Sequence, residues 1–461
     1  MTRIHFVTAL ALWFVLRIGL GLLPGYPSDV VQIKSWALSS AVHGPAAIYE
    51  TSTYDYPPVF SYLIYPLGKL YLALHPEIGA AEMTRGEGDL LRFRSSDGTL
   101  YRHPSFPRAR SGVSSRPRFE SLPGSQGFSL LVKLPGLFFD LVIAAVLFRL
   151  VSSGGTWGPT RTSPRWGRLA AAAWLWNPAL LWNSGYWGMP DPIHGAFALV
   201  AVTSLGVARW GKSGAAMAIA VLMKPLAAPL VPLWVWVIAA RSGGPGLARG
   251  LGAAVGATSL VFWPFFVWGD GPTVVARVFA DLSAMPFTSI NAHNLWLFIG
   301  PWKPTSTPLF LGLSSGVIGP GLALAAIFVL LFVNRTWLVG GREEDRVDPK
   351  IFTGRLLVVA SAIAGSFFLV STHMHENHLF TAIPFITAVA GRDRRLAWLT
   401  VGLSGAFFFN LVLHDPSLGM PVRNGGEFWS LHRLVTSANA CGVTATVVYL
   451  YRTAWRVRSI I

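Results

Sequence analysis

Long apolar runs, separated by short polar turns, recur along almost the whole chain. A helix needs about 20 mostly apolar residues to cross the hydrocarbon core of a bilayer. The first run, 4–23, follows a single Arg3 and lacks a small-residue cleavage site, so we expect a retained membrane helix rather than a signal peptide. The further runs are 57–75, 130–150, 169–184, 192–208, 213–223, 225–240, 250–268, 306–333, 356–371, 378–390, 396–413 and 434–451. This pattern predicts an all-α polytopic integral membrane protein, one membrane domain over 1–461, with about 11–13 transmembrane or re-entrant helices.

Several of these runs are too short to span the bilayer as straight helices. The run 213–223 is the clearest case, and Pro225 and Pro232 interrupt the apolar residues that follow it. Helices broken at membrane depth are tolerated where they are buried in protein or line a cavity. We therefore expect residues 213–240 to be buried in the protein or to line a cavity.

The composition supports a membrane protein and excludes several other classes. Apolar residues make up 52% of the chain and charged residues 13%, against roughly 25% charged residues in an average soluble protein. The single cysteine, Cys441, excludes a disulfide scaffold and a cysteine-based zinc or iron–sulfur site. The Gly-Gly pairs at 154–155 and 243–244 lie in basic turns and are not followed by Lys-Ser or Lys-Thr, so we expect no nucleotide binding there.

The formal net charge of +16 is divided among the loops between the apolar runs, which is not the pattern of a nucleic-acid-binding surface. Short cytoplasmic loops of membrane proteins are enriched in Lys and Arg. Counting back from the C-terminal tail, we expect the basic segments on the cytoplasmic side: 161–168, 209–212, 241–249, 334–355, 392–395 and 452–458. The intervening segments are then extracytoplasmic: 183–191, 269–292, 371–377 and 414–433.

The N-terminal part fits this scheme less well. If 57–75 crosses the membrane, the number of crossings is wrong by one, so either this run is re-entrant or interfacial or a later short run does not span. The stretch 76–128 contains eight arginines against six acidic residues, and its Arg, Ser, Gly and Pro content is typical of a partly flexible segment. The positive charge of this stretch favours the cytoplasmic side, whereas the number of membrane crossings favours the extracytoplasmic side. We expect it outside, within one long first loop, 24–128.

Polar and ionisable residues on the expected extracytoplasmic side concentrate in four places. An ionisable group at membrane depth indicates a functional site, because its burial is expensive unless it is paired. The four places are Asp29 and Trp36 with the run Tyr54-Asp55-Tyr56-Pro57-Pro58; residues 177–191 with Tyr186, Trp187 and Asp191; residues 277–296 with Arg277 and His293; and residues 373–378 with His373, His375, Glu376 and His378.

The order of these segments resembles the C-type (GT-C) glycosyltransferases, multi-spanning enzymes that take a sugar from a polyprenyl-phosphate carrier. The run YDYPPVFSY (54–62) is similar to the DYPPLTAY of the dolichyl-phosphate-glucose glucosyltransferases of asparagine glycosylation. The runs ARVFADLSAMPF…AHNLW (276–296) and HMHENHLFTAIPF (373–385) resemble further segments of those enzymes.

Two more segments resemble the prokaryotic mannosyltransferase-like relatives of these enzymes. They are KLPGLFFD (133–140) and NPALLWNSGYWGMPD (177–191), in which Met189-Pro190 departs from the relatives' Gln-Val or Gln-Thr. The resemblance covers about 20–415. Each motif alone is weak, and their occurrence in this order carries the resemblance.

The resemblance implies transfer of a hexose, mannose or glucose, from a polyprenyl-phosphate donor to a lipid-linked or cell-envelope glycan acceptor, with inversion, at the extracytoplasmic face. Asp29 resembles the family's acidic residue in the first extracytoplasmic loop, the base that takes the acceptor's proton. Candidates for binding the donor phosphate are His373, His375, His378 and Arg433, with Arg277 and His293 behind them. Candidates for binding the sugar and acceptor are Trp36, Tyr54, Asp55, Tyr186, Trp187, Asp191 and Glu376.

The expected partners are the lipid bilayer, the lipid-linked donor and the glycan or glycolipid acceptor. We expect no cofactor, because a monophosphate donor does not require a metal. A divalent metal stays open as an alternative, since some relatives use one. Two further alternatives are a donor with a pentose carrier and a non-enzymatic lipid or solute transporter with the same outer cavity.

Simpler structural roles are open for most of these residues. Asp29 is also well placed to cap a helix over 30–40, Asp55 to fix the turn before a proline-started helix, and Asp191 to cap a helix with Pro192 at its first position.

The histidine run 373–378 lacks the zincin spacing, so metal binding, donor binding and a polar helix start remain alternatives. Lys224 is interpreted as an anchor that snorkels to the cytoplasmic interface, with contact to a lipid phosphate as the alternative. Arg17, Lys133 and Asp140 lie within apolar runs and should face the bundle interior, although the sequence does not assign their pairing.

Overall fold

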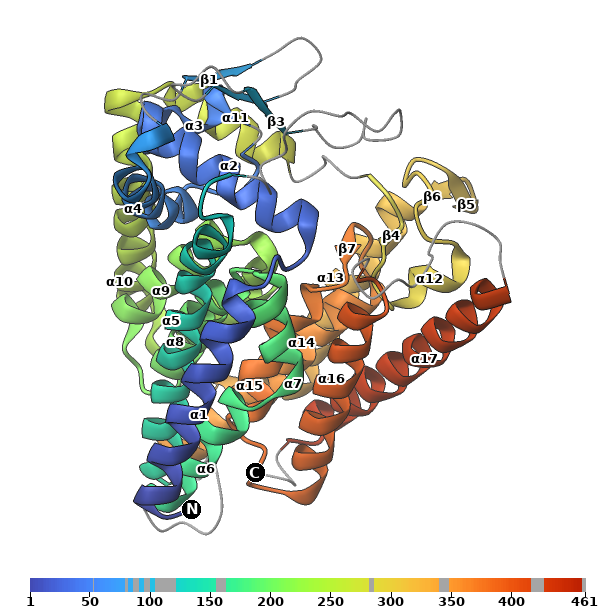
Figure 1. Ribbon diagram of the computed structural model, residues 1–461. Coiled ribbons are helices and arrows are strands. Elements are labelled where there is room, and N and C mark those ends of the chain that lie inside the picture. The colour runs from blue at the N-terminus through green and yellow to red at the C-terminus, as the bar shows by residue number, and fades with distance from the viewer. Residues whose placement is uncertain are drawn as a thin grey trace.

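The computed structural model confirms an all-α polytopic membrane architecture (Figure 1). It describes residues 1–52, 54–78, 82–85, 91–94, 100–103, 122–154, 163–281, 286–339, 348–415 and 427–457. Seven helical segments of this part are long and apolar enough to cross a membrane: α1 (Arg3–Leu22), α5 (Ser125–Ser152), η5 with α10 (Pro225–Leu230 and Val231–Trp268), α13 (Ser315–Val339), α14 (Pro349–Val370), α16 (Arg394–Val412) and α17 (Glu427–Trp455).

Shorter helices complete the bundle where proline or glycine interrupts an apolar run. They are α6 (Pro164–Leu175), α7 (Pro178–Leu180), the π-helical η4 (Leu181–Trp187), α8 (Asp191–Gly206), α9 (Trp210–Met223), η7 (His378–Ala382) and α15 (Ile383–Thr387). The expected break at Pro225 occurs, because α9 ends at Met223 and the 3-10 helix η5 follows. Pro232 does not interrupt a helix, since it lies in the first turn of α10, where a proline is tolerated. The later kink in α10 is at Gly243, whose φ is 58°.

Both chain termini lie at one end of the bundle, which we call the terminal end (Figure 1). Basic side chains join the loops there. Arg168 Nε donates to the carbonyl oxygen of Met1 at 3.1 Å, and Lys350 Nζ donates to that of Ser153 at 2.6 Å. Arg241 donates to the carbonyl oxygens at the end of α13. These basic residues belong to segments for which the sequence predicts a common side of the membrane.

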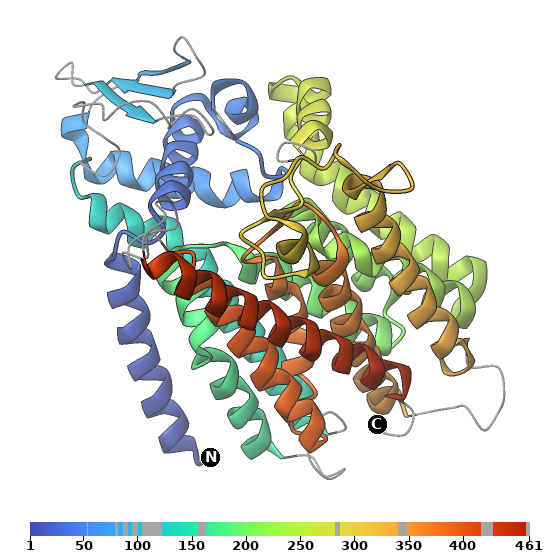
Figure 2. The ribbon, with the colours of Figure 1, turned by 90° about the vertical axis from the view of Figure 1, so that its right-hand side faces the viewer.

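The opposite end, called the loop end, carries the first loop. Its helical elements are α2 (Pro27–His43), η1 (Pro45–Ala47), α3 (Ile48–Thr51), α4 (Val59–Leu74), η2 (Pro76–Ile78), α11 (Gly271–Asp281) and α12 (Leu295–Ile299). Helix α4, from the run 57–75, lies across this end rather than along the bundle (Figures 1 and 2). It packs against α2, where Gly68 faces the carbonyl of Ala37 and leaves no space for a side chain.

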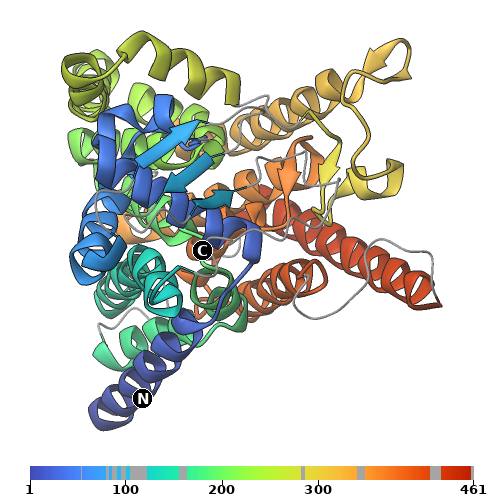
Figure 3. The ribbon, with the colours of Figure 1, turned by 45° about the horizontal axis from the view of Figure 1, so that its top comes forward.

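Short strands, which the sequence did not predict, also lie at the loop end. In the first loop, β1 (Glu82–Arg85), β2 (Leu91–Arg94) and β3 (Leu100–His103) form an antiparallel sheet over the first-loop helices (Figure 3). The remaining residues of the Arg-rich stretch, 79–81, 86–90, 95–99 and 104–121, lie outside the described residues. Strand β4 (Ser289–Ile290) pairs in parallel with β7 (Met374–His375), and β5 (Pro308–Phe310) pairs with β6 (Leu313–Ser314).

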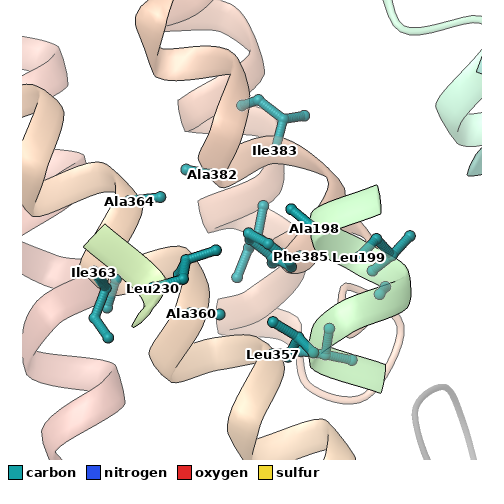
Figure 4. Packing of buried hydrophobic residues seen from close by; sticks show 14 of the residues in the cluster. Ala198, Leu199, Leu230, Leu357, Ala360, Ile363, Ala364, Ala382, Ile383 and Phe385 are labelled. Carbon is teal, nitrogen blue, oxygen red and sulfur yellow. The ribbon is translucent and has the colours of Figure 1, made fainter. Parts of the chain in front are cut away.

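Helix α14 lies at the centre of the bundle, and 89% of its most apolar 18-residue stretch is buried. It packs through small and branched residues such as Ala360 and Leu357 against α8 and α15, which contribute Leu199 and Phe385 (Figure 4). Peripheral helices instead expose large apolar side chains, and Leu260 on α10 is 77% exposed. Extended exposed apolar surface is typical of contact with lipid.

Candidate functional site

Buried and half-buried polar side chains from five segments gather at the loop end. These segments are the first turn of α2, the loop before α4, the start of α8, the break between α9 and η5, and the β7–η7 segment. We call this group the polar cluster, and its members are Asp29, Tyr56, Asp191, Lys224, His375, Glu376 and His378. All but Lys224 lie in segments that the sequence singled out.

Asp191 is the anchor of the polar cluster. Its side chain is fully buried, and its Oδ1 accepts a 2.6 Å hydrogen bond from Lys224 Nζ. Its Oδ2 accepts hydrogen bonds from the side-chain amides of Asn183 and Asn377, each at 3.1 Å. Asp191 therefore joins η4, η5 and the β7–η7 segment. It is not the cap of α8, because it is the first residue of that helix and its carboxylate is bound to Lys224.

The position of Lys224 contradicts the interpretation of this residue as a snorkelling anchor at the cytoplasmic interface. It is 8% exposed and lies at the loop-end terminus of α9, bound to Asp191. Its ammonium also lies 5.8 Å from the centre of the Tyr56 ring, within cation–π range. The sequence signal that could have located it is the helix break at Pro225, because a cation at a broken helix inside the bundle requires a buried partner.

Asp29 lies in the first turn of α2, and a tryptophan holds its carboxylate. The indole Nε1 of Trp187 donates to Asp29 Oδ2 at 2.7 Å, and the Trp187 ring stacks on Tyr26 with centroids 4.3 Å apart. Gly25, with φ of 74°, allows the chain before α2 to approach the backbone of η4. Asp29 is not an N-cap, since α2 begins at Pro27 and Tyr26 is its cap residue.

Glu376 lies in the turn between β7 and η7. Its side chain is 6% exposed among neighbouring residues, and its Oε2 has no hydrogen-bond partner within the described residues. Burial is the main cause that raises the pKa of Glu376 to about 8, and the charge of Asp29 adds to it while that of Lys224 opposes it. Glu376 is therefore largely protonated at neutral pH and can donate a hydrogen bond.

The histidines of this segment are uncharged at neutral pH. Burial, followed by the charge of Lys224, lowers the pKa of His375 to about 4, and burial also lowers the pKa of His373. His378 Nδ1 accepts a 3.2 Å hydrogen bond from the backbone N–H of His375. His373 has a φ of 61° and donates its backbone N–H to Phe287, which fixes the segment beside β4. Within the described residues, no group of three His, Cys, Asp or Glu side chains is placed to hold a metal ion.

The aromatic residues assigned to the acceptor include Trp36 on α2 and Tyr54 in the loop before α4, and they pack together. Trp36 and Tyr54 are buried, with ring centroids 5.1 Å apart, and the Tyr54 hydroxyl donates to the carbonyl of Pro57. Tyr56 is half-buried, and burial and the nearby charges, that of Asp191 first, raise its pKa well above the usual range. Asp55 is exposed. The Trp36 ring also contacts Tyr56, with centroids 5.6 Å apart, and so helps to position it.

The remaining aromatic candidates lie on η4. Trp187 is buried and binds Asp29, whereas Tyr186 is half-buried. The Tyr186 ring packs against Trp182, with centroids 4.5 Å apart, and lies 6.0 Å from the ammonium of Lys133. Trp187 is joined to the polar cluster by its hydrogen bond to Asp29.

His293 belongs to a second polar group, between the β4–α12 loop and helices α16 and α17. The amide of Asn439 donates to its Nδ1 at 2.7 Å, so its Nε2 carries the proton and donates to Nε2 of His414 at 2.9 Å. Burial is the main cause that lowers the pKa of both histidines, that of His414 to about 3. Arg433 is exposed on α17, and Arg277 is half-exposed on α11.

The ionisable residues within the spans are paired away from the polar cluster. Arg17 binds Asp140 at 2.9 Å, and the hydroxyl of Ser184 donates to the same carboxylate oxygen at 2.7 Å. Lys133 donates to the carbonyl oxygens of Leu20 and Leu23 at the end of α1. The sequence left the pairing of these three residues unassigned, and the structure pairs Arg17 with Asp140 while Lys133 binds backbone carbonyls.

The arrangement provides a held carboxylate, a protonated carboxyl group and a buried ammonium within one polar cluster. Such a set can accept a proton, donate a hydrogen bond and bind an anion. Comparison with protein-family models and with curated proteins gives no match for this chain.

Proposed function

We propose that this chain is a GT-C-type glycosyltransferase. It transfers a hexose, mannose or glucose, from a polyprenyl-phosphate donor to a lipid-linked or cell-envelope glycan acceptor, with inversion. The observation that carries the proposal is the convergence of segments far apart in the sequence. Asp29, Tyr56, Asp191 and Glu376 come from separate motifs of the resemblance and lie in one polar cluster.

The proposed chemistry assigns the base to Asp29. The acceptor hydroxyl oxygen attacks C1 of the hexose, its proton passes to the Asp29 carboxylate, and the bond from C1 to the phosphate oxygen breaks with its electron pair leaving on the polyprenyl phosphate. The hydrogen bond from Trp187 orients the carboxylate. Glu376, protonated at neutral pH, is placed to donate a hydrogen bond to an oxygen of the sugar or phosphate.

The proposed location of the reaction is the extracytoplasmic face. Arg168, Arg241 and Lys350 bind loop carbonyls at the terminal end, whereas the polar cluster lies at the loop end. Because short basic loops favour the cytoplasmic side, these loops at the terminal end support an extracytoplasmic polar cluster. The Arg-rich strands at the loop end belong to the long first loop, to which this rule does not apply.

The test is the Asp29→Asn variant, assayed in lipid vesicles with synthetic polyprenyl-phosphate mannose and glucose and an extract of lipid-linked glycans. Loss of a general base should lower the transfer rate by about 10²- to 10⁴-fold. The matched control is Asp270→Asn, an exposed loop-end carboxylate that caps α11 and can be replaced in that role by asparagine.

Transfer at the wild-type rate by Asp29→Asn would refute the assignment of the base. Absence of hexose transfer by the wild-type protein with every donor, together with protein-dependent solute flux across the vesicle, would favour the transporter alternative.

A further inference from the structure

Lys224 has fewer hydrogen bonds than a buried ammonium requires. An ammonium group has three N–H donors. Within the described residues, Lys224 Nζ makes one hydrogen bond, to Asp191 Oδ1 at 2.6 Å. The face of the Tyr56 ring lies 5.8 Å away, and the carboxyl group of Glu376 and the rings of His375 and His378 are near enough to interact with its charge. The side chain is only 11% exposed. Two donors of a nearly buried cation are thus available to a further acceptor.

Asp191 does not depend on Lys224 alone. Its second carboxylate oxygen accepts hydrogen bonds from Asn183 and Asn377, both at 3.1 Å. These two amides come from the η4 segment and the β7–η7 turn, and they hold Asp191 in place independently of the lysine. Lys224 can therefore share its charge with a second anion without losing the framework around Asp191.

The position of Lys224 in the bundle also favours a ligand. Helix α9 has 14 residues, about 21 Å at 1.5 Å per residue, which is shorter than the roughly 30 Å hydrocarbon core. Its first residue, Trp210, packs against Gly246 just after the kink of α10. Lys224 follows its last residue, at the break between α9 and the 3-10 helix η5. Broken helices inside membrane bundles commonly carry ion and substrate sites.

We propose that Lys224 binds the phosphate of the lipid-linked donor, with Asp191 as its partner when no donor is bound. This inference rests on the proposed glycosyl transfer. The donor phosphodiester carries one negative charge, and the polyprenyl phosphate that leaves gains a second when the bond to C1 breaks. An ammonium with two unused donors binds the first charge and stabilises the second. The histidines at 373, 375 and 378 then serve as neutral neighbours rather than as cations.

The first measurement is binding of farnesyl phosphate, compared with farnesol, to the full-length protein in detergent micelles. The wild-type protein should bind farnesyl phosphate more tightly. Lys224→Gln should abolish this preference, whereas Asp191→Asn should keep or strengthen it, because the competing carboxylate charge is gone. A purely structural ion pair predicts instead that both variants lose binding together.

The double variant Lys224→Gln/Asp191→Asn separates ligand binding from folding. Neither buried group is then charged, and the two amides at 191 and 224 can hydrogen-bond to each other while Asn183 and Asn377 keep an oxygen acceptor. We expect it to melt near the wild-type temperature, to bind farnesyl phosphate no better than farnesol, and to show donor kcat/KM lowered by about 10²- to 10³-fold. Wild-type phosphate preference and transfer in this variant would overturn the inference.

The two proposals fail in different ways. If the wild-type protein transfers hexose and the double variant does so equally well, the assignment of Lys224 is wrong and the glycosyltransferase proposal stands. If the wild-type protein transfers no hexose but binds farnesyl phosphate through Lys224, the phosphate site stands and the reaction is wrong.

Discussion

The buried pair of Arg17 and Asp140 gives the most direct test of the membrane bundle itself. Both side chains are at most 3% exposed and are joined at 2.9 Å. Arg17 also donates to Ser184 Oγ at 2.9 Å and to the carbonyl of Leu180 at 3.3 Å, and Ser184 donates to Asp140. This network joins α1, α5 and the segment from α7 to η4. Replacing Asp140 by Asn keeps an acceptor oxygen but removes the negative charge.

The expected effect follows from what Asp140→Asn leaves behind. The hydrogen bonds of Arg17 to Ser184 and Leu180 remain possible, so the main loss is the compensation of a buried positive charge. Breaking a buried ion pair from one side destabilises a protein by about 3–5 kcal/mol. Removing both charges with Arg17→Met/Asp140→Leu should restore most of this, because well-packed apolar replacements of such pairs are often neutral or stabilising. In the double variant the single hydroxyl proton of Ser184 can be donated to the Leu180 carbonyl, 3.0 Å away.

The assay is SDS-induced unfolding in mixed micelles, followed by circular dichroism and by tryptophan fluorescence. The double-mutant cycle isolates the coupling of the two charges. Glu77→Gln is the control, because Glu77 pairs with His75 at the exposed end of the first loop and its replacement should not change the unfolding midpoint measurably. If Asp140→Asn costs less than about 1 kcal/mol, or if the double variant is as unstable as the sum of its parts, the reasoning is refuted.

Two further predictions concern pH. The pKa of Glu376 is raised from 4.5 to about 8 in the folded protein, so the folded state holds the extra proton and stability should fall as pH rises through this interval. The Glu376→Gln variant should not show this fall in melting temperature between pH 6 and pH 8, and it should retain hexose transfer. An unchanged pH dependence of the melting temperature would contradict the assignment. The pKa of His414 is lowered from 6.5 to about 3 and that of His293 is also lowered, so the folded state resists protonation and stability should be lost as pH falls below 6.5. The His414→Gln variant should have a lower melting temperature at pH 7, but this temperature should change less between pH 7 and pH 4 than in the wild-type protein. Equal acid sensitivity of the two proteins would contradict this prediction.

The sequence was sufficient to predict the class of fold because the apolar runs are long. The run 4–23 corresponds to α1, and 356–371 lies within α14. Boundaries were less predictable where the pattern has no sharp signal. The run 306–333 was expected to be helical throughout, whereas it begins in the β5–β6 hairpin and α13 starts only at Ser315. Strands of two or three residues leave no alternation in the sequence to detect.

The candidate site was predictable in its segments but not in its contacts. Motif order brought Asp29, Asp191 and Glu376 together, and the structure places them in one polar cluster. The bond between Asp191 and Lys224 joins residues 33 positions apart. No local rule predicts it, because it depends on how α8 packs against α9. The role of Asp29 as a helix cap was wrong for a local reason, since Pro27 rather than Asp29 starts α2.

The buried cations show how the positive charge of the chain divides between topology and chemistry. A loop cation in water needs no fixed partner and therefore reports orientation. A buried cation must find acceptors. Arg17 has a carboxylate, a hydroxyl and a carbonyl, while its Nε has no hydrogen-bond partner among the described residues, and Lys133 has the two carbonyls that end α1. Lys224 has one carboxylate oxygen for three donors, and this shortfall lies in the same cluster as the proposed base. The partners of Arg17 and Lys133 explain them as structural residues, whereas the unused donors of Lys224 are explained by an anion that enters and leaves.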